Sequence, residues 1–313
     1  MEAAMEKTFY PASFDITWQP TWLARASRPG RPLMVALHTW GGTVDQDCAG
    51  YQETAARLDF NLLHPEFRGP NRTPLACGSD AMVSDLADAT LYAIAATAAD
   101  PARVYLIGGS GGGHAALLMQ RRHPRLWAAV SSWCPIFDLA GWHAECLNRP
   151  DCQNYSRDIE AVLGGAPDND ARKADALHRC AKGWPAVNDV PLDISCGIHD
   201  GHTGSVPVRH SIHAFNTTAA PADRIPEEVV EEIVATERVP EMWQAARETP
   251  DWGGRRVWLR RVSGNVRLTV FEGGHDLFPG AGGEWLARQR RGAAADWSAA
   301  PAAAERDDVR LRG

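Results

Sequence analysis

The clearest candidate for covalent chemistry is the segment from Arg103 to His114, which reads Arg-Val-Tyr-Leu-Ile-Gly-Gly-Ser-Gly-Gly-Gly-His. Within it, Gly108 to Gly112 match the pattern Gly-x-Ser-x-Gly, with Ser110 at the centre. A β-branched and aromatic stretch precedes the pattern and a helical stretch follows it. This context predicts a sharp strand-to-helix turn that exposes the serine hydroxyl at a helix N-terminus, where negative charge is stabilised. We therefore predict that Ser110 is a nucleophile.

The same glycine cluster has two other interpretations. A dinucleotide-binding Gly-x-Gly-x-x-Gly loop needs glycine where Ser110 and His114 stand, and no lysine follows as a P-loop requires. A glycine turn with only a structural role also stays open. The nucleophile interpretation accounts best for the strand before Ser110 and the helix after it.

A serine nucleophile needs a base, and the base needs an acid that orients it. His275 follows a predicted strand from Val266 through the turn Gly273-Gly274, and a final helix is expected over 284–291. Asp200 lies just past another predicted strand that begins near Val190. The chain order serine, acid, histidine is the one used on sheets that place the serine on such a turn. The predicted catalytic residues are Ser110, Asp200 and His275.

Other candidates for the acid and for a metal site remain open. Asp276 and Glu272 flank the histidine turn, but both are tied to the base's own loop, which makes an approach to its Nδ1 difficult. His199-x-x-His202 and His210-x-x-His213 could be read as metal ligands, although no coherent ligand set emerges. We expect no metal and no cofactor.

The pattern of elements predicts an α/β fold. Strands are expected at 33–37, 61–63, 104–107 and 127–132, alternating with helices at 51–58 and 80–98, while 8–26 reads as two antiparallel edge strands. In the helix over 80–98, apolar residues recur at i, i+3, i+4 and i+7, which marks a face turned to the core. Such alternation indicates a mostly parallel central sheet flanked by helices.

Several motifs in this order resemble the α/β-hydrolase superfamily, and within it the prolyl-oligopeptidase-like branch. They are His38-Thr-Trp-Gly-Gly42, Pro65-Glu-Phe-Arg-Gly69, the Ser110 turn, Gly197-Ile-His-Asp200 with Val206-Pro-Val208, and Gly273-Gly-His275. The resemblance implies an α/β-hydrolase fold and hydrolysis of esters or peptides through an acyl-enzyme. The family's peptidases carry a large N-terminal β-propeller, whereas only about thirty residues precede the strand at 33–37 here, which shifts the expectation from peptidase towards esterase.

The loop after the strand at 33–37 resembles the His-Gly-x-Gly-Gly loop of esterases and lipases, with Thr39 in place of the first glycine. The resemblance implies an oxyanion hole made by the backbone N–H of Gly111 and that of Trp40, with Thr39 as the alternative donor. Removing one such donor typically costs about 2.7–4 kcal/mol of transition-state stabilisation.

Substrate contacts are predicted for side chains near this centre. The chain holds 12 tryptophans, and Trp40, Trp133 and Trp142 would form an aromatic wall for a sugar or aryl group if they line the cleft, although core packing is the alternative for each. The predicted substrate-binding residues are Thr39, Arg68, Asn71, Trp133, Trp142, His199 and His202.

Chain length and composition predict one domain over residues 1–291. A cap-like insertion is expected at 136–186, a second insertion at 217–261, and a poorly ordered tail at 292–313. Of 313 residues, 44% are hydrophobic, which can supply a large core. In the second insertion, a helix is expected to start at Pro226.

The net charge of −7 gives no basic patch, so we expect no nucleic-acid partner. No apolar run reaches the 18 or more residues of a membrane span, and the first residues lack an apolar signal core. We expect a cytoplasmic protein without a membrane partner, and the sequence leaves homodimer formation open. The seven cysteines suit free thiols, with Cys146/Cys152 and Cys48/Cys77 as candidate pairs.

Together these features predict a serine esterase that cleaves small-molecule carboxylic esters through an acyl-enzyme, with a carbohydrate or aryl ester as a candidate substrate. A small aminopeptidase or oligopeptidase is the alternative enzyme. A catalytically inactive binding module on the same fold is the alternative of another class.

Overall fold

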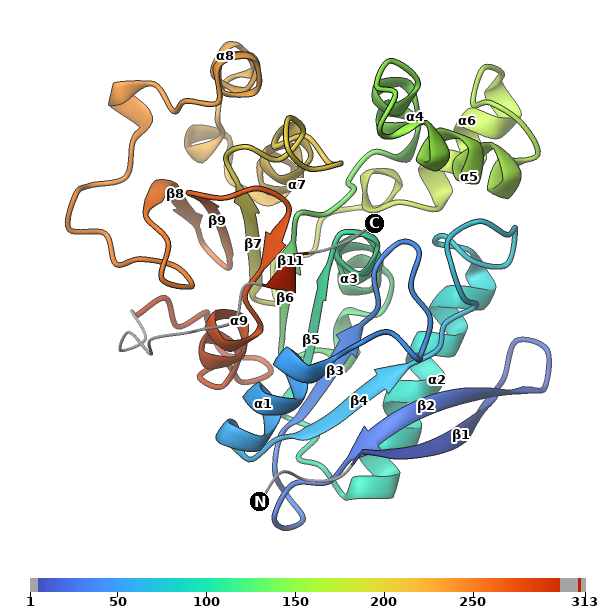
Figure 1. Ribbon diagram of the computed structural model, residues 1–313. Coiled ribbons are helices and arrows are strands. Elements are labelled where there is room, and N and C mark those ends of the chain that lie inside the picture. The colour runs from blue at the N-terminus through green and yellow to red at the C-terminus, as the bar shows by residue number, and fades with distance from the viewer. Residues whose placement is uncertain (1–4, 299–308, 311–313) are drawn as a thin grey trace.

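The computed structural model describes residues 5–298 and 309–310 of the chain (Figure 1). The strands are β1 (Glu6–Ala12), β2 (Thr17–Ala24), β3 (Leu33–Leu37), β4 (Asn61–Pro65), β5 (Val104–Gly109), β6 (Ala129–Trp133), β7 (Leu192–Gly197), β8 (Val257–Ser263), β9 (Val266–Phe271), β10 (Asp276–Leu277) and β11 (Val309–Arg310). The α-helices are α1 (Ala49–Leu58), α2 (Asp80–Thr97), α3 (Gly111–Arg122), α4 (Leu139–Leu147), α5 (Gln153–Leu163), α6 (Asp170–His178), α7 (Arg209–Thr218), α8 (Glu227–Thr236) and α9 (Pro279–Leu286).

One large sheet organises the described residues, with the strand order β1-β2-β4-β3-β5-β6-β7-β9-β8. Its inner strands β4, β3, β5, β6, β7 and β9 run parallel. The β1–β2 hairpin at one edge and β8 at the other edge pair antiparallel. The mostly parallel sheet and the antiparallel first edge confirm the predicted fold class. Parallel strands place their carboxyl ends at one edge, where ligands bind in open α/β folds.

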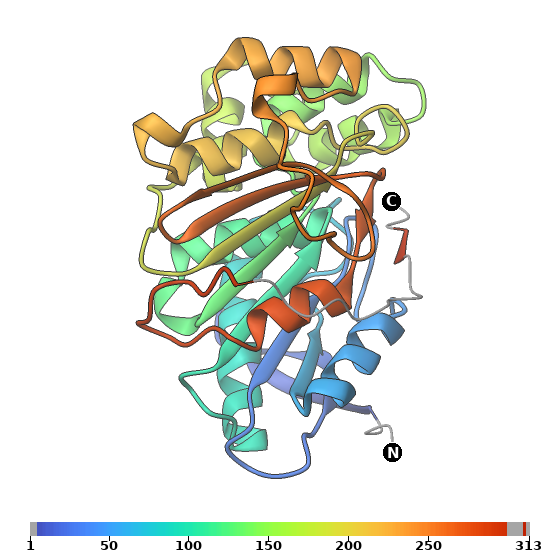
Figure 2. The ribbon, with the colours of Figure 1, turned by 90° about the vertical axis from the view of Figure 1, so that its left-hand side faces the viewer.

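Each face of the sheet has its own apolar layer because side chains alternate along a strand. Leu33, Val35 and Leu37 of β3 join a cluster with buried residues of α2, α3 and α7. Met34 and Ala36 of the same strand join a second cluster with buried residues of α1 and α9. The two helical layers lie on opposite faces of the sheet (Figures 1 and 2). Helices packed on both faces hold the sheet in place, and with it the loops at the carboxyl ends of its parallel strands.

The segment between β6 and β7 forms helices α4, α5 and α6, which lie above one edge of the sheet (Figures 1 and 2). They have an apolar cluster of their own, which includes Trp142, Tyr155 and Ile159 and takes in Trp40 from the loop after β3. The three helices fall within the range 136–186, for which the sequence predicts a cap-like insertion. Because Trp40 belongs to its core, the helical insertion is packed directly on the predicted oxyanion loop.

Three segments differ from the sequence-based expectations. The last helix is α9, Pro279–Leu286, rather than 284–291, because Pro279 opens it and its glycines allow close packing: an ideal Cβ on Gly283 would lie 2.3 Å from Thr54 Cγ2. The insertion at 217–261 contains most of the edge strand β8, which pairs with β9 across the turn Gly264-Asn265.

The expected tail, 292–313, is only partly described. Within its described part, Trp297 stacks on Trp285 with ring centroids 5.3 Å apart and donates a hydrogen bond to Gly264 O. The start of this segment therefore packs on the domain, which differs from the predicted poor order, because a large aromatic ring gains burial against α9. Residues 299–308 and 311–313 lie outside the described part.

None of the helices in the described part of the chain is long and apolar enough to cross a membrane. All seven cysteines are buried and free, so neither Cys146/Cys152 nor Cys48/Cys77 forms a disulfide.

Candidate active site

Ser110 occupies the turn between β5 and α3 with φ 57° and ψ −120°, a backbone conformation that non-glycine residues rarely adopt. Its side chain is only 2% exposed, and its backbone N–H donates to Trp133 O at 2.9 Å. A strained serine between a buried strand and a helix N-terminus is the geometry that the sequence pattern predicts for a nucleophile.

The glycines around Ser110 are required by close backbone approach. An ideal Cβ would lie 2.5 Å from Gly112 O at Gly108, 2.5 Å from the backbone N of Trp40 at Gly111, and 2.8 Å from His38 O at Gly112. Each of these distances is shorter than a real Cβ contact allows. The turn is therefore packed against the loop that follows β3, which brings the amide of Trp40 next to Gly111.

Asp200 and His275 follow β7 and β9, which are neighbours in the sheet. His275 Nδ1 donates to Asp200 Oδ2 at 2.7 Å, and Asp200 Oδ1 accepts from the backbone N–H of Val206 at 3.1 Å. The two loops are also joined by the His199 N–H, which donates to Gly273 O at 2.9 Å. Asp200 is 2% exposed and His275 is 8% exposed, so solvent barely screens their interaction.

The competing acids have other partners. Asp276 Oδ2 accepts from the backbone N–H of Gly274 at 2.9 Å, and so holds the histidine turn itself. Glu272 accepts from Trp258 Nε1 at 2.8 Å and from His199 Nε2 at 2.9 Å. The acid bonded to His275 is therefore Asp200.

The second nitrogen of His275, Nε2, is buried and has no hydrogen-bond partner among the described residues. Ser110, Asp200 and His275 follow the carboxyl ends of β5, β7 and β9, which lie among the four consecutive parallel strands β5-β6-β7-β9. A histidine with Nδ1–H on a carboxylate carries its lone pair on Nε2, where a general base accepts a proton.

The loop after β3 is held in one conformation by polar side chains. Gln46 Oε1 accepts from both the backbone N–H and the hydroxyl of Thr39, at 2.8 and 3.0 Å. Asn71 bonds to Trp40 O through its backbone N–H at 2.9 Å and its side-chain amide at 3.3 Å. Because Gln46 already takes the Thr39 N–H, Trp40 is the better candidate for the second oxyanion donor.

Glu66, which the sequence analysis did not single out as functional, braces the same loop. Its carboxylate accepts from the backbone N–H of Val44 at 2.8 Å and that of Phe67 at 3.2 Å, and it lies 3.7 Å from His38 Nε2. Burial would raise the pKa of Glu66, but these bonds and His38 hold it below its usual value. The sequence signal is its place in the segment Pro65 to Gly69, directly after β4.

The ring of Trp40 anchors the helical insertion. It lies 4.8 Å from the ring of Trp142 and 6.4 Å from that of Tyr155, and its Nε1 donates to Asp158 Oδ2 at 3.0 Å. Trp142 in turn donates from Nε1 to Ser205 O at 2.9 Å, in the loop that carries Asp200. The insertion thus contacts both the oxyanion loop and the acid loop.

Several predicted substrate-binding side chains have structural partners instead. Arg68 forms ion pairs with Asp85 at 2.5 Å and Asp15 at 2.6 Å, which tie α2 to the β1–β2 hairpin. Trp133 is fully buried among Trp252, Phe271 and Phe278. These contacts turn both side chains away from a substrate role, and Asn71 and Trp142 serve the two loops described above.

His199, which is half-buried, and His202, which is exposed, lie on the acid loop. His199 bridges Glu237 at 2.7 Å and Glu272 at 2.9 Å, and these carboxylates raise its pKa although burial alone would lower it. His202 Nε2 donates to Val234 O at 2.7 Å. They lie beside Asp200 in the chain, and no hydrogen bond or ion pair among the described residues joins either of them to Ser110.

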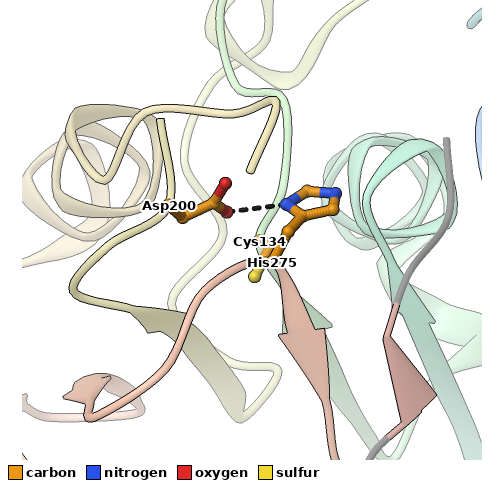
Figure 3. A group of neighbouring side chains, drawn as sticks. All are labelled: Cys134, Asp200 and His275. Atoms are coloured by element: carbon orange, nitrogen blue, oxygen red, sulfur yellow. Dashed lines mark hydrogen bonds and ion pairs between the residues drawn. The ribbon is translucent and has the colours of Figure 1, made fainter. Parts of the chain in front are cut away.

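Cys134, which directly follows β6, was missed by the sequence analysis. Its sulfur donates to Asp276 O at 3.5 Å, and burial followed by the charge of Asp200 raises its pKa well above the usual value. Figure 3 shows it beside Asp200 and His275. The strand order could have found it, because β6 lies between the strands that carry Ser110 and Asp200.

These three residues form the one cluster of metal-type ligands found in the described part of the chain. The four histidines 199, 202, 210 and 213 do not form one. His210 Nε2 pairs with Glu145 at 3.0 Å and His213 Nε2 with Glu227 at 3.0 Å, and both are ordinary ion-pair contacts.

Comparisons with known proteins agree with this architecture. The sequence pattern of the Prolyl oligopeptidase family matches residues 79–162. Oligopeptidase B from Leishmania major superposes with a TM-score of 0.53 at 16% identity, over 68% of this chain and 30% of that one. An acylaminoacyl peptidase from Pyrococcus horikoshii gives 0.58 at 12% identity, over 91% and 40%.

An acylaminoacyl peptidase in complex with Z-Gly-Gly-Phe-chloromethyl ketone gives a TM-score of 0.60 at 13% identity, over 91% of this chain and 40% of that one. No curated protein matched the chain in the sequence comparison. The chain thus spans well under half of these solved structures. The protein has an α/β-hydrolase fold that resembles the catalytic domains of prolyl-oligopeptidase-type enzymes.

Proposed function

We propose that this protein is a serine hydrolase of the prolyl-oligopeptidase type that cleaves short peptides through an acyl-enzyme. The observation that carries the proposal is the buried Asp200–His275 hydrogen bond, which leaves His275 Nε2 unpartnered at the sheet edge where Ser110 stands. A carboxylate-bound histidine and a strained serine on a glycine turn are the parts that acyl transfer requires.

In the proposed reaction, Ser110 Oγ attacks the carbonyl carbon of the scissile bond while His275 Nε2 takes the hydroxyl proton. The carboxylate of Asp200 stabilises the imidazolium that forms. The backbone N–H groups of Gly111 and Trp40 hold the oxyanion. His275 then gives its proton to the leaving amine, and water hydrolyses the acyl-enzyme with the same histidine as base.

Peptides rank above esters as substrates because the family match and the compared structures are those of peptidases. The expectation of a carbohydrate or aryl ester loses its main support, since Trp133 and Trp142 are buried in two apolar clusters. An ester remains the second candidate, because an acyl-enzyme forms equally from an ester carbonyl.

Two measurements test the proposal. A fluorophosphonate probe should label wild-type protein and leave Ser110→Ala unlabelled, whereas an unlabelled wild type would favour the inactive binding module. Substrates that share one N-acylated amino acid but differ in leaving group, an anilide and an alkyl ester, then separate the two enzymes. Anilide turnover that vanishes in Ser110→Ala supports a peptidase. Ester turnover by the wild type, with anilide turnover no higher than that of Ser110→Ala, would identify an esterase.

A further inference from the structure

The cluster of Cys134, Asp200 and His275 is built from three neighbouring strand ends, those of β6, β7 and β9 (Figure 3). One potential ligand atom of each residue lies within 4.8 Å of the others. Cys134 is 1% exposed, so all three side chains are buried together. The Cys134 thiol has no role in the proposed acyl transfer, so its position beside Asp200 and His275 has a different explanation.

A thiolate, a carboxylate and an imidazole are the ligand types that Zn²⁺ prefers, and three protein ligands with one open position form a common zinc geometry. Tetrahedral zinc with bonds of about 2.0–2.3 Å separates its ligand atoms by about 3.3–3.7 Å. Nδ1 of His275 and Oδ2 of Asp200, now 2.7 Å apart, must therefore separate slightly. The ligand atoms of the cluster lie within 4.8 Å of one another, so the sulfur has about 1 Å to move inward.

We propose that Zn²⁺ binds to Cys134 Sγ, an Asp200 carboxylate oxygen and His275 Nδ1, and that this site inhibits the enzyme. The inference rests on the proposed function in one respect, that His275 acts as the base. Binding of zinc itself does not depend on it.

Zinc binding changes the protonation of both His275 and Cys134. In the metal-free state, neutral His275 carries its proton on Nδ1 and its lone pair on Nε2. Zinc takes the Nδ1 lone pair, so the imidazole keeps one proton but carries it on Nε2. The thiol of Cys134 loses its proton to solvent and binds as thiolate. One proton is released for each zinc bound, and no electron is transferred.

Inhibition follows from this change of tautomer. With Nε2 protonated, His275 has no lone pair to accept the hydroxyl proton of Ser110. Zinc also replaces the Asp200 hydrogen bond that stabilises the imidazolium. Both effects remove base catalysis while leaving the Ser110 turn and the oxyanion loop unchanged.

Access to the cluster is restricted by the loop that follows Asp200. An ideal Cβ on Gly204 would lie 2.3 Å from Asp200 Oδ1 and 2.6 Å from His275 Cβ, so this loop lies directly over the pair. Zinc can enter only when the loop opens. We therefore expect inhibition with a slow onset and a slow reversal by chelator.

The rival site is the pair Cys146 and Cys152 in the helical insertion, whose buried thiols contact each other. Two thiols could also bind zinc, so Cys146 is replaced as a control. Cys196, a buried thiol on β7 outside the cluster, provides the matched control for loss of a buried sulfur.

Binding is best measured in full-length Ser110→Ala protein, which keeps the proposed ligands but has no turnover. Calorimetric titration with Zn²⁺ in two buffers of different ionisation enthalpy counts the released protons. Titration with Co²⁺ should give a sulfur-to-cobalt charge-transfer band. We expect one zinc, one proton, and at least about tenfold weaker binding when Cys134→Ala or Cys134→Ser is added.

Cys146→Ala and Cys196→Ala, in the same background, should leave zinc affinity and the cobalt band unchanged. Thermal melting of each variant establishes that it is folded. No saturable zinc binding to folded Ser110→Ala, or binding that survives Cys134→Ala and falls with Cys146→Ala, would overturn the proposal. Because this assay needs no substrate, its failure is separate from failure of the proposed function.

The activity arm uses wild-type protein on whichever substrate it turns over. Added zinc should slow turnover progressively and chelator should restore it, while magnesium has no effect. Chelator alone should never lower the rate. Zinc that binds the cluster without slowing turnover would contradict the tautomer argument and leave only a structural metal site.

Discussion

Strands β7 and β9 carry two acid–base pairs that look alike by distance. Inside the sheet, Arg267 Nε donates to Asp193 Oδ1 at 2.7 Å, across directly paired positions. Beyond the strand ends, His275 Nδ1 donates to Asp200 Oδ2 at the same 2.7 Å. All four side chains are buried. A short buried contact therefore does not by itself identify a functional pair.

The difference lies in what the base does with its remaining atoms. Arg267 is surrounded by the rings of Trp252, Trp297 and Trp285, at 4.6, 4.9 and 5.8 Å, which stabilise its guanidinium group. Its buried Nη2 has no partner but can only donate. The unpartnered Nε2 of His275 can accept a proton and return it. Proton transfer requires a base that can gain and lose a proton, and of these two pairs only the one beyond the strand ends has such a base.

The largest effect that separates the pairs is expected for Asp200→Asn. The amide keeps the shape of the side chain but favours the wrong histidine tautomer, so kcat should fall by about 10⁴-fold while the melting temperature changes little. Steady-state kinetics and thermal melting of the purified variant check both halves. Retention of more than about a tenth of the wild-type kcat would show that another group orients His275.

The second effect is expected for Asp193→Ala, which should lower stability and leave kcat unchanged. Removing this carboxylate leaves the charge of Arg267 buried without its counter-ion, which should lower the free energy of unfolding by about 3–5 kcal/mol. The kcat per folded molecule should stay near wild type, because Asp193 contacts none of the proposed catalytic groups. Urea unfolding and active-site titration measure the two quantities. Loss of kcat without loss of stability would mean that the two pairs are coupled.

The sequence predicts those parts of this comparison that depend on local patterns. Apolar and β-branched runs predict the strands, and the glycines around Ser110 and before His275 predict the two turns. Such features depend on strand propensity and on backbone sterics. The fold class and the position of the Ser110 turn could therefore be derived before any contact was known.

Side-chain partners distant in the chain could not be derived in this way. Arg68 and Trp133 have the residue types of a binding site, but Asp85 and Trp252 engage them, and neither contact leaves a local signal. The glycines of α9 argue against a helix by propensity, yet at Gly283 the packing on α1 leaves no room for a Cβ. The edge strand β8 did leave a signal, the turn Gly264-Asn265 between two β-rich runs.

A third effect distinguishes His275 from another buried histidine beside the nucleophile. His114 also has one unpartnered nitrogen, but its Nε2 donates to a carbonyl, Arg179 O, at 2.9 Å. Burial lowers the pKa of His114 to about 4, because no carboxylate supports its charged form. The folded state thus holds a neutral imidazole, while the unfolded chain binds a proton below a pH of about 6.5.

Between a pH of about 6.5 and about 4 the unfolded state binds more protons than the folded state. The free energy of unfolding therefore falls as the pH drops through this window. One such histidine accounts for up to roughly 3 kcal/mol. His114→Gln keeps an N–H for Arg179 O and cannot titrate, so it should lose less stability on acidification. Urea unfolding from about pH 7 to pH 4 measures this. Parallel stability curves for wild type and variant would contradict the argument.

The smallest expected effect is on kcat and concerns how the Trp40 amide, a proposed oxyanion donor, is kept in place. Trp40 carries a proposed oxyanion donor on its backbone, and its ring is fixed by Asp158 at 3.0 Å. Asp158→Ala should let this ring move and displace the amide by a fraction of an ångström. Losing the donor outright would cost about 2.7–4 kcal/mol, so partial misplacement should lower kcat by about tenfold with little change in KM.

Two control variants accompany Asp158→Ala. Asp158→Asn keeps an acceptor for Trp40 Nε1 and should restore kcat, while Arg157→Ala, on the exposed side of α5, controls for changes in the insertion. An equal loss in Asp158→Asn and Asp158→Ala would mean that the charge of Asp158, and not its hydrogen bond to Trp40, supports turnover.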